Sequence, residues 1–156
     1  MATATADFRG EVGERVESAP VPVRLETMAE YTRSVSEPGY EQNIHTDLEI
    51  ARRYGLDEPI AEGRMWTTLL STLLGTALGR AWLSTGALSL TFTKMVKPGD
   101  EITARGVVTA VRAEPAGRRV QLEVWCENQR GEKVAVGSAA CLIDGGRGAS
   151  PGARPR

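Results

Sequence analysis

The stretch Pro59-Ile-Ala-Glu-Gly-Arg-Met-Trp-Thr-Thr-Leu-Leu-Ser-Thr-Leu-Leu-Gly-Thr-Ala-Leu-Gly79 determines the fold of this chain. Its apolar side chains recur at the i, i+3, i+4, i+7 spacing of one helical face, whereas a strand would alternate. They are Trp66, Leu69, Leu70, Leu73, Leu74, Ala77 and Leu78. The opposite face consists of Thr67, Thr68, Ser71, Thr72, Gly75 and Thr76. Because that face is small and uncharged, we expect the helix to be buried on nearly all sides, with the rest of the chain wrapped around it.

Gly63 stands at the beginning of this predicted helix. The first backbone N–H groups of a helix have no partner within it, so they can donate hydrogen bonds to a developing negative charge. Gly63 is therefore a candidate hydrogen-bond donor to an anion. Alternatively, it is only the residue through which the chain enters a buried helix.

The composition is that of an ordinary globular chain. With 156 residues, of which 41% are hydrophobic and 25% charged, the chain can bury one core, and we expect a single domain. Its 19 basic and 20 acidic residues leave a net charge of −1, which gives no electrostatic reason to expect nucleic acid or an anionic membrane as the main partner. No apolar run approaches the roughly 20 residues of a membrane span, and the N-terminus lacks the pattern of a signal peptide. We expect a cytoplasmic protein.

The two ends of the chain differ in composition from its middle. Residues 1–10 show no periodicity, and residues 145–156 are rich in glycine, proline and arginine and cannot bury a core. We therefore predict a flexible leader over 1–10, one folded domain over 11–144 and a disordered tail over 145–156.

Short elements precede the long helix. Prolines interrupt two strand-like pieces, 14–17 and 21–25, which favours a position at the edge of a sheet. A first short helix is predicted over 28–36, before a Pro-Gly pair. A second follows, for which Thr46 or Asp47 can supply the N-terminal cap.

After the long helix, the period of the pattern changes to that of a strand. Leu88, Leu90 and Phe92 alternate with small polar residues, and turn sequences separate three further extended runs, at 102–113, 120–126 and 133–143. Four consecutive strands joined by short turns indicate an antiparallel meander. One apolar helix followed by such strands is an α+β arrangement, in which the sheet is expected to curl around the helix.

The chain contains two cysteines, Cys126 and Cys141. Both fall in strand-like runs, and their spacing is not that of metal ligands. We expect core thiols rather than a disulfide, a redox pair or a metal site.

Several landmarks together resemble a known family. Asn43-Ile-His45-Thr-Asp47 is followed by Ala51-Arg-Arg-Tyr-Gly55, by Pro59-Ile-Ala-Glu-Gly63 and by the helix from Leu69 to Gly75. With Lys97-Pro-Gly-Asp100 after them, they resemble the MaoC-like branch of the (R)-specific enoyl-CoA hydratases over roughly residues 12–143. The resemblance implies the hotdog fold, an α+β fold in which an antiparallel sheet wraps a long central helix.

The resemblance also assigns roles to residues. It makes His45, the only histidine, the catalytic imidazole, Gly63 the backbone donor to the thioester carbonyl and Ser71 a pocket hydroxyl. Glu62 replaces the histidine that usually precedes the helix glycine in that family. Arg64, directly after Gly63, is a candidate substrate contact and alternatively an ion-pair partner of Glu62.

One position departs from the family. The family has an aspartate five residues before the histidine, which helps it to activate water, and this chain has Tyr40 there. Tyrosine, with a pKa near 10, is a poor general base at neutral pH. Glu41, Glu37 and Glu62 are nearby carboxylates that can replace the aspartate if the loop takes another path. A glutamate in that role is our preference, and the sequence does not choose among the three.

The resemblance implies a lyase that hydrates a 2-enoyl thioester, or dehydrates a 3-hydroxyacyl thioester, of CoA or a carrier protein. It implies no metal or redox cofactor. The alternative, favoured by Tyr40, is a catalytically degenerate or accessory hotdog subunit that binds acyl groups or performs altered acid–base chemistry. A hotdog thioesterase is less favoured, because residues 65–79 contain no carboxylate of the kind these enzymes place on the central helix. The open edge of such a sheet leads us to expect a homodimer.

Overall fold

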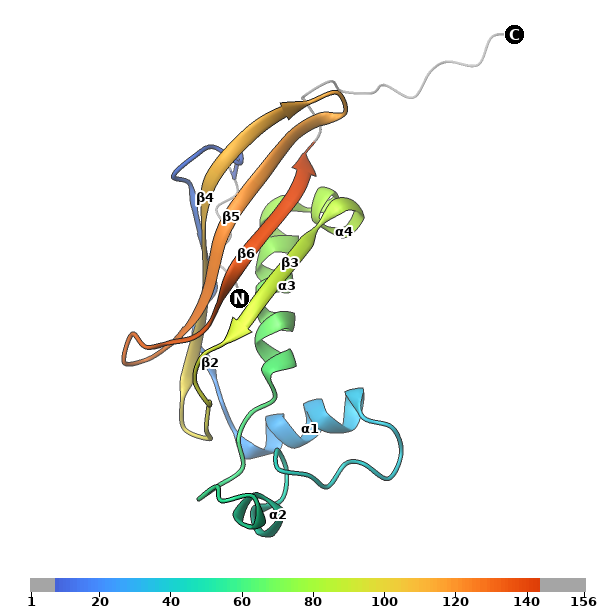
Figure 1. Cartoon of the computed structure of the whole chain (residues 1–156), viewed down its shortest axis with the longest axis vertical. Coiled ribbons are helices and arrows are strands. Elements are labelled where there is room, and N and C mark those ends of the chain that lie inside the picture. The colour runs from blue at the N-terminus through green and yellow to red at the C-terminus, as the bar shows by residue number, and fades with distance from the viewer. Residues whose placement is uncertain (1–7, 144–156) are drawn as a thin grey trace, which may run out of the picture.

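The computed structural model describes residues 8–143, whose strands form one antiparallel sheet that curves along a long helix (Figure 1). In chain order the elements are β1 (Arg15–Glu17), β2 (Val21–Pro22), α1 (Leu25–Val35), α2 (Leu48–Arg53), α3 (Gly63–Leu78), α4 (Arg80–Thr85), β3 (Ala87–Phe92), β4 (Glu101–Glu114), β5 (Gly117–Asn128) and β6 (Lys133–Ile143). The helix α4 lies at one end of α3, and α1 and α2 lie at the other (Figure 1). This is the predicted α+β class.

The strand order is β1-β4-β5-β6-β3, with β2 also beside β4. The predicted edge position of the first two strand pieces is confirmed, and β4, β5 and β6 form the expected meander. The prediction that all four later strands form a meander was wrong, because β3 pairs with β6 instead of β4. The connection from β3 to β4 is long enough to cross the end of the sheet, and hydrogen bonds from Thr93 to Val134 and from Ala61 to Val96 hold it there.

The core lies between α3 and the inner face of the sheet. Alternate residues of β5 point toward the helix, and all of them are fully buried. They are Val120, Leu122, Val124 and Cys126, and they belong to one apolar cluster with Leu70, Leu73 and Leu74 of α3. Burial of this apolar area is the main term that stabilises the fold.

The helix α3 is buried on one side only. Thr68, Thr72 and Thr76 are exposed along its other side, together with Arg64. The prediction of a helix enclosed on nearly all sides was therefore wrong for a single chain. The sheet curves around the apolar face alone, and it leaves the small polar face without a covering layer.

Two helices differ from the prediction in extent or existence. Helix α1 begins at Leu25, three residues earlier than predicted. Helix α4 was not predicted at all. Gly79, with φ of +58°, turns the chain directly from α3 into α4, where Trp82 is buried. The predicted cap of α2 is confirmed at Asp47, whose carboxylate accepts a hydrogen bond of 2.9 Å from the Ile50 N–H.

Residues 8–10 are packed instead of loose. Gly10 is buried, and Phe8 contacts the core cluster. The packed chain therefore begins before residue 11, where the domain was predicted to start. The remainder of the predicted leader, residues 1–7, and the predicted tail over 145–156 lie outside the described residues.

Both cysteines are buried and free, as predicted. Burial raises the pKa of the Cys126 thiol to about 12. A thiol of this kind stays protonated and unreactive at neutral pH. Separately, none of the helices in the described part of the chain is both long and apolar enough to cross a bilayer.

Candidate active site

A cavity of about 360 Å³ lies where the end of β3, the start of α3 and the loop before α2 meet. Most of its lining residues are apolar, and a few are polar, as in small-molecule sites generally. The described residues that line it are His45, Ile60, Ala61, Gly63, Trp66, Phe92, Thr93, Lys94, Met95 and Val96. Two of the predicted site residues, His45 and Gly63, are therefore brought together.

His45 is held in one orientation by the loop and by the segment before α3. Its backbone N–H donates to the Asn43 side-chain oxygen at 2.8 Å, and its Nδ1 lies 2.7 Å from the Ile60 carbonyl oxygen. A carbonyl oxygen only accepts hydrogen bonds, so Nδ1 carries the proton. In the neutral ring, Nε2 is then left with a free lone pair, which is the form that a general base requires.

Gly63 is the first residue of α3. Within residues 8–143 no acceptor is paired with its N–H, and no side chain caps the helix. An ideal Cβ on Gly63 would lie 2.9 Å from two ring atoms of Phe92, so this position has room only for glycine unless the ring moves. The glycine thus allows an aromatic wall to pack against the beginning of the helix while the N–H stays available.

Glu62 does not line the cavity. It is 5% exposed, and both of its carboxylate oxygens are engaged. The Thr32 hydroxyl donates to Oε1 at 2.7 Å, and the Arg64 guanidinium donates to Oε2 from Nε at 3.0 Å and from Nη2 at 2.7 Å. Arg64 is therefore the ion-pair partner of Glu62, the second of its two predicted roles, and its side chain does not reach the cavity either.

The loop residues Tyr40, Glu37 and Glu41 are not among the described residues that line the cavity. The Tyr40 side chain is exposed, and so is Glu37. The Glu41 carboxylate accepts a hydrogen bond of 2.9 Å from the Gly39 N–H, and backbone hydrogen bonds from Gly39 and from Glu41 itself lower the pKa of this carboxyl. Of the described residues that line the cavity, none is an aspartate or glutamate. The described residues of this cavity thus supply no carboxylate that could replace the missing aspartate.

Ser71 is likewise not among the described residues that line the cavity. Its hydroxyl oxygen accepts a hydrogen bond of 3.0 Å from the Trp82 indole N–H, which joins α3 to α4. Within one chain this hydroxyl has a packing role, and its predicted contact with substrate stays a prediction.

Among the cavity's lining residues that sequence reasoning did not assign to the site, three have side chains of particular interest. Trp66 and Phe92 supply its aromatic walls, and Lys94 stands at its rim in a 2.6 Å ion pair with Glu132. The alternation that places Leu88 and Leu90 on the inner face of β3 also places Phe92 there, and this signal could have identified it.

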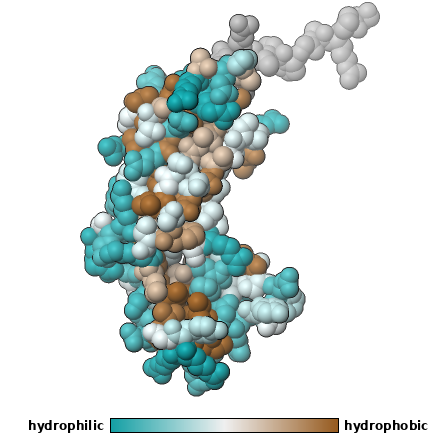
Figure 2. All heavy atoms as spheres, viewed as in Figure 1, coloured by the Kyte–Doolittle hydropathy of each residue, from teal (hydrophilic) through white to brown (hydrophobic). Residues whose placement is uncertain are grey.

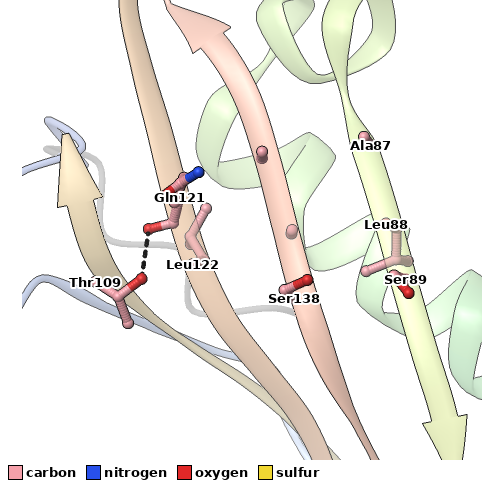
Figure 3. Close-up of a pocket in the computed structure, with 9 residues that line it drawn as sticks. Ala87, Leu88, Ser89, Thr109, Gln121, Leu122 and Ser138 are labelled. Atoms are coloured by element: carbon pink, nitrogen blue, oxygen red, sulfur yellow. Dashed lines mark hydrogen bonds between the residues drawn. The ribbon is translucent and has the colours of Figure 1, made fainter. Parts of the chain in front are cut away.

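A second hollow of about 350 Å³ lies on the sheet itself (Figure 3). Small residues of β3 and β6, among them Ser89 and Ser138, form its floor, and Thr109 donates a hydrogen bond of 3.3 Å to the Gln121 carbonyl at its side. None of the described residues that line it is titratable. It therefore lacks the acid–base chemistry that the cavity at His45 provides.

A family model described as the MaoC-like domain matches residues 7–124, which is most of the chain. The chain belongs to the MaoC-like domain family. A search of curated proteins finds no match.

Solved structures agree with this assignment. An (R)-hydratase from A. caviae involved in PHA biosynthesis superposes on this MaoC-like domain with a TM-score of 0.71 and 27% identity, over 85% of this chain and 96% of the other. The R-hydratase PhaJ1 from Pseudomonas aeruginosa gives a TM-score of 0.69 and 24% identity, over 87% and 83%. The HadBC (3R-hydroxyacyl-ACP dehydratase) complex from Mycobacterium tuberculosis gives 0.65 and 20%, over 88% and 98%. The predicted hotdog fold is confirmed.

Proposed function

We propose that this MaoC-like domain is a hydro-lyase that adds water to a 2-enoyl thioester, or removes it from a 3-hydroxyacyl thioester, of CoA or a carrier protein. The observation that carries the proposal is the pairing, in one cavity, of an imidazole with a free Nε2 and an uncapped N–H at a helix N-terminus. The family and the similarity to the A. caviae (R)-hydratase support the same reaction class.

In this reaction His45 handles protons. Its Nε2 accepts a proton from water as the water oxygen forms a bond to C3 of the enoyl group. The electrons of the C2–C3 double bond move toward the carbonyl oxygen of the thioester. The imidazolium then returns one proton to C2, so that the elements of one water molecule are added and the enzyme is regenerated.

Gly63 handles the charge. Negative charge builds up on the thioester oxygen while C2 is an enolate carbon, and a backbone N–H aimed at that oxygen stabilises it. The N-terminus of the sixteen-residue helix α3 adds the favourable field of its macrodipole. The apolar walls formed by Trp66 and Phe92 exclude water and strengthen both effects.

The direct test is to incubate the purified protein with crotonyl-CoA and to follow the loss of the enoyl absorbance. A steady loss that depends on protein concentration is the expected result. A carrier-protein thioester of the same acyl group, run beside it, shows which carrier is preferred.

A second candidate function rests on the absence of a carboxylate among the described residues of the cavity. In this alternative the chain is an accessory subunit that completes its site with a partner; the ChsH1-ChsH2 and HadBC structures are complexes of two different chains. Inactivity of the chain alone, together with a gain of hydratase activity in Tyr40→Asp, would favour it.

We also propose a homodimer in the cytoplasm as the working form. Within residues 8–143 the strand β3 pairs only with β6, so no described strand pairs with its other edge. Beside it lies the uncovered face of α3 with Thr68, Thr72 and Thr76. Hydrophobic residues also reach the surface near α1 (Figure 2). Light scattering at micromolar concentration should give twice the 16.8 kDa chain mass, and a monomer mass would contradict this.

A further inference from the structure

Glu62 is a buried carboxylate at the N-cap of α3, and neither the sequence nor the family explains it. It is 5% exposed, and its partner Thr32 on α1 is fully buried. Thr32 and Arg64 together donate three hydrogen bonds to the two oxygens of the Glu62 carboxylate. A buried charge with this many donors is fixed in place, because any movement would leave it unpaired.

The direction of this carboxylate is unusual for its position. An acidic side chain at an N-cap normally accepts a hydrogen bond from an N–H of the first helical turn. The Glu62 side chain makes no such bond. Thr32 and Arg64 engage it instead. Within residues 8–143, the Met65 N–H donates to the Glu62 carbonyl at 3.0 Å, and the Gly63 N–H has no acceptor.

Glu62 also belongs to the segment on which both proposed catalytic groups depend. The Ile60 carbonyl accepts from His45 Nδ1 at 2.7 Å, and the Ile60 N–H donates to the Ile44 carbonyl at 3.2 Å. The Ala61 N–H donates to the Val96 carbonyl at 2.8 Å. Gly63, which follows, lines the cavity. Glu62 is the residue of this segment that ties it to α1, thirty positions earlier.

We propose that Glu62 is a positioning residue that, with Thr32 and Arg64, fixes residues 60–63 so that His45 and the Gly63 N–H keep their places in the cavity. The inference rests on the proposed hydro-lyase function. It excludes Glu62 as the water-activating base, since both of its oxygens are occupied and neither reaches the cavity.

Arg64 has a further part in this arrangement. An unpaired carboxylate one residue from the oxyanion donor would oppose the negative charge that develops on the thioester oxygen. The two-atom contact of the guanidinium with Oε2 offsets that charge. Because the Arg64 side chain is mostly exposed, it can be changed without opening the core.

Two isosteric changes test the proposal. Glu62→Gln keeps an acceptor for Thr32 but removes the charge and the ion pair. Thr32→Val removes the hydroxyl at nearly constant volume, and Thr32→Ser restores it. Glu114→Gln is the matched control, since it removes a similar two-atom carboxylate contact with Arg119 at the distant β4–β5 turn.

The first readout does not depend on activity. His45 is the only histidine, so a long-range ¹H–¹⁵N spectrum of the labelled protein contains one imidazole and reports its tautomer directly. We expect a single Nδ1–H tautomer in the wild type and in Glu114→Gln. Glu62→Gln and Thr32→Val should give a mixture of tautomers, and Thr32→Ser should return to the single form.

The second readout is the hydration of crotonyl-CoA. We expect kcat to fall by about 10- to 100-fold in Glu62→Gln and Thr32→Val with KM within about twofold, as is typical when reacting groups are misplaced by a fraction of an ångström to one ångström. Thr32→Ser should recover most of the loss. If either isosteric variant fails to fold, Arg64→Ala at the exposed end of the network should show both effects in weaker form.

The outcomes separate this inference from the proposed function. An unchanged tautomer in folded Glu62→Gln, Thr32→Val and Arg64→Ala would overturn the positioning role, whatever the activity. If the variants change the tautomer but the wild-type protein hydrates no thioester, the positioning role is supported and the hydratase proposal is refuted.

Discussion

His45 Nδ1 and the carbonyl oxygen of Ile60 lie 2.7 Å apart, and this contact fixes which imidazole nitrogen carries the proton in the neutral ring. Nδ1 must carry a proton, and in the neutral ring Nε2 has the free lone pair. Because Ile60 is three residues before Gly63, the same short segment places the proton acceptor and the oxyanion donor. In the proposed mechanism, the chemistry of the site therefore depends on the backbone of residues 60–63 as much as on the imidazole.

Replacement of the two loop glutamates should leave activity nearly unchanged. Glu37 is exposed, the Glu41 carboxylate is engaged by the Gly39 N–H, and neither lines the cavity. We expect Glu37→Gln, Glu41→Gln and the companion variant Tyr40→Phe to keep crotonyl-CoA hydration within about threefold of wild type, whereas removal of a general base costs about 10²- to 10⁴-fold. A loss of several orders of magnitude in either glutamine variant would identify it as the base that the sequence favoured.

Gly63→Ala should destabilise the protein through Phe92. At an open first position of a helix alanine is usually better than glycine, but here the added Cβ would lie 2.9 Å from the Phe92 ring. We expect a loss of about 1–3 kcal/mol in the free energy of unfolding, as is typical of overpacking. In urea titrations the double variant Gly63→Ala/Phe92→Leu should be more stable than the sum of the single changes predicts. Additive effects would show that the contact with Phe92 is not the cause.

Much of the fold was predictable from local pattern. The 3.6-residue period identified α3, and the two-residue period identified the later strands with Phe92 on the inner face. The partner of β3 was not predictable in this way, because alternation shows which face a residue occupies and not which strand lies beside it. Helix α4 was missed because a single glycine, Gly79, separates it from α3, and the sequence pattern does not show the turn.

The site was predictable only in part. His45 and Gly63 were identified by motif, and the structure places both at one cavity. The contact of Glu62 with Thr32 was not predicted, since Thr32 is thirty residues away and no local spacing links the two residues. Tyr40 stands at the position of the family aspartate, which suggested a place near His45. Its side chain is instead exposed to solvent.

The rim of the cavity should be sensitive to acid through Glu132. Hydrogen bonds from Asn128, Lys94 and Arg130 lower the pKa of this carboxyl from 4.5 to about 2. A carboxyl whose pKa is lower in the folded than in the unfolded state stabilises the fold above the unfolded pKa, and this contribution is lost as the pH falls toward the folded pKa. Glu132→Gln should thus be less stable than wild type at pH 5 and above, with the difference declining below about pH 4.5 and vanishing near pH 2. Urea midpoints measured across this range give the comparison, and a difference that stays constant with pH would contradict it.

The most direct test of the central claim compares crotonyl-CoA hydration by the wild-type protein and by His45→Ala, with circular dichroism to verify that both are folded. His45 lies at the wall of a cavity outside the main core, so its loss should not unfold the chain. We predict that the wild type hydrates crotonyl-CoA, seen as a loss of the enoyl absorbance. The hydration rate of the variant should be lower by about 10²- to 10⁴-fold, the usual contribution of general acid–base catalysis. A folded His45→Ala variant with near-full activity, or a wild-type homodimer with none, would contradict the proposed mechanism.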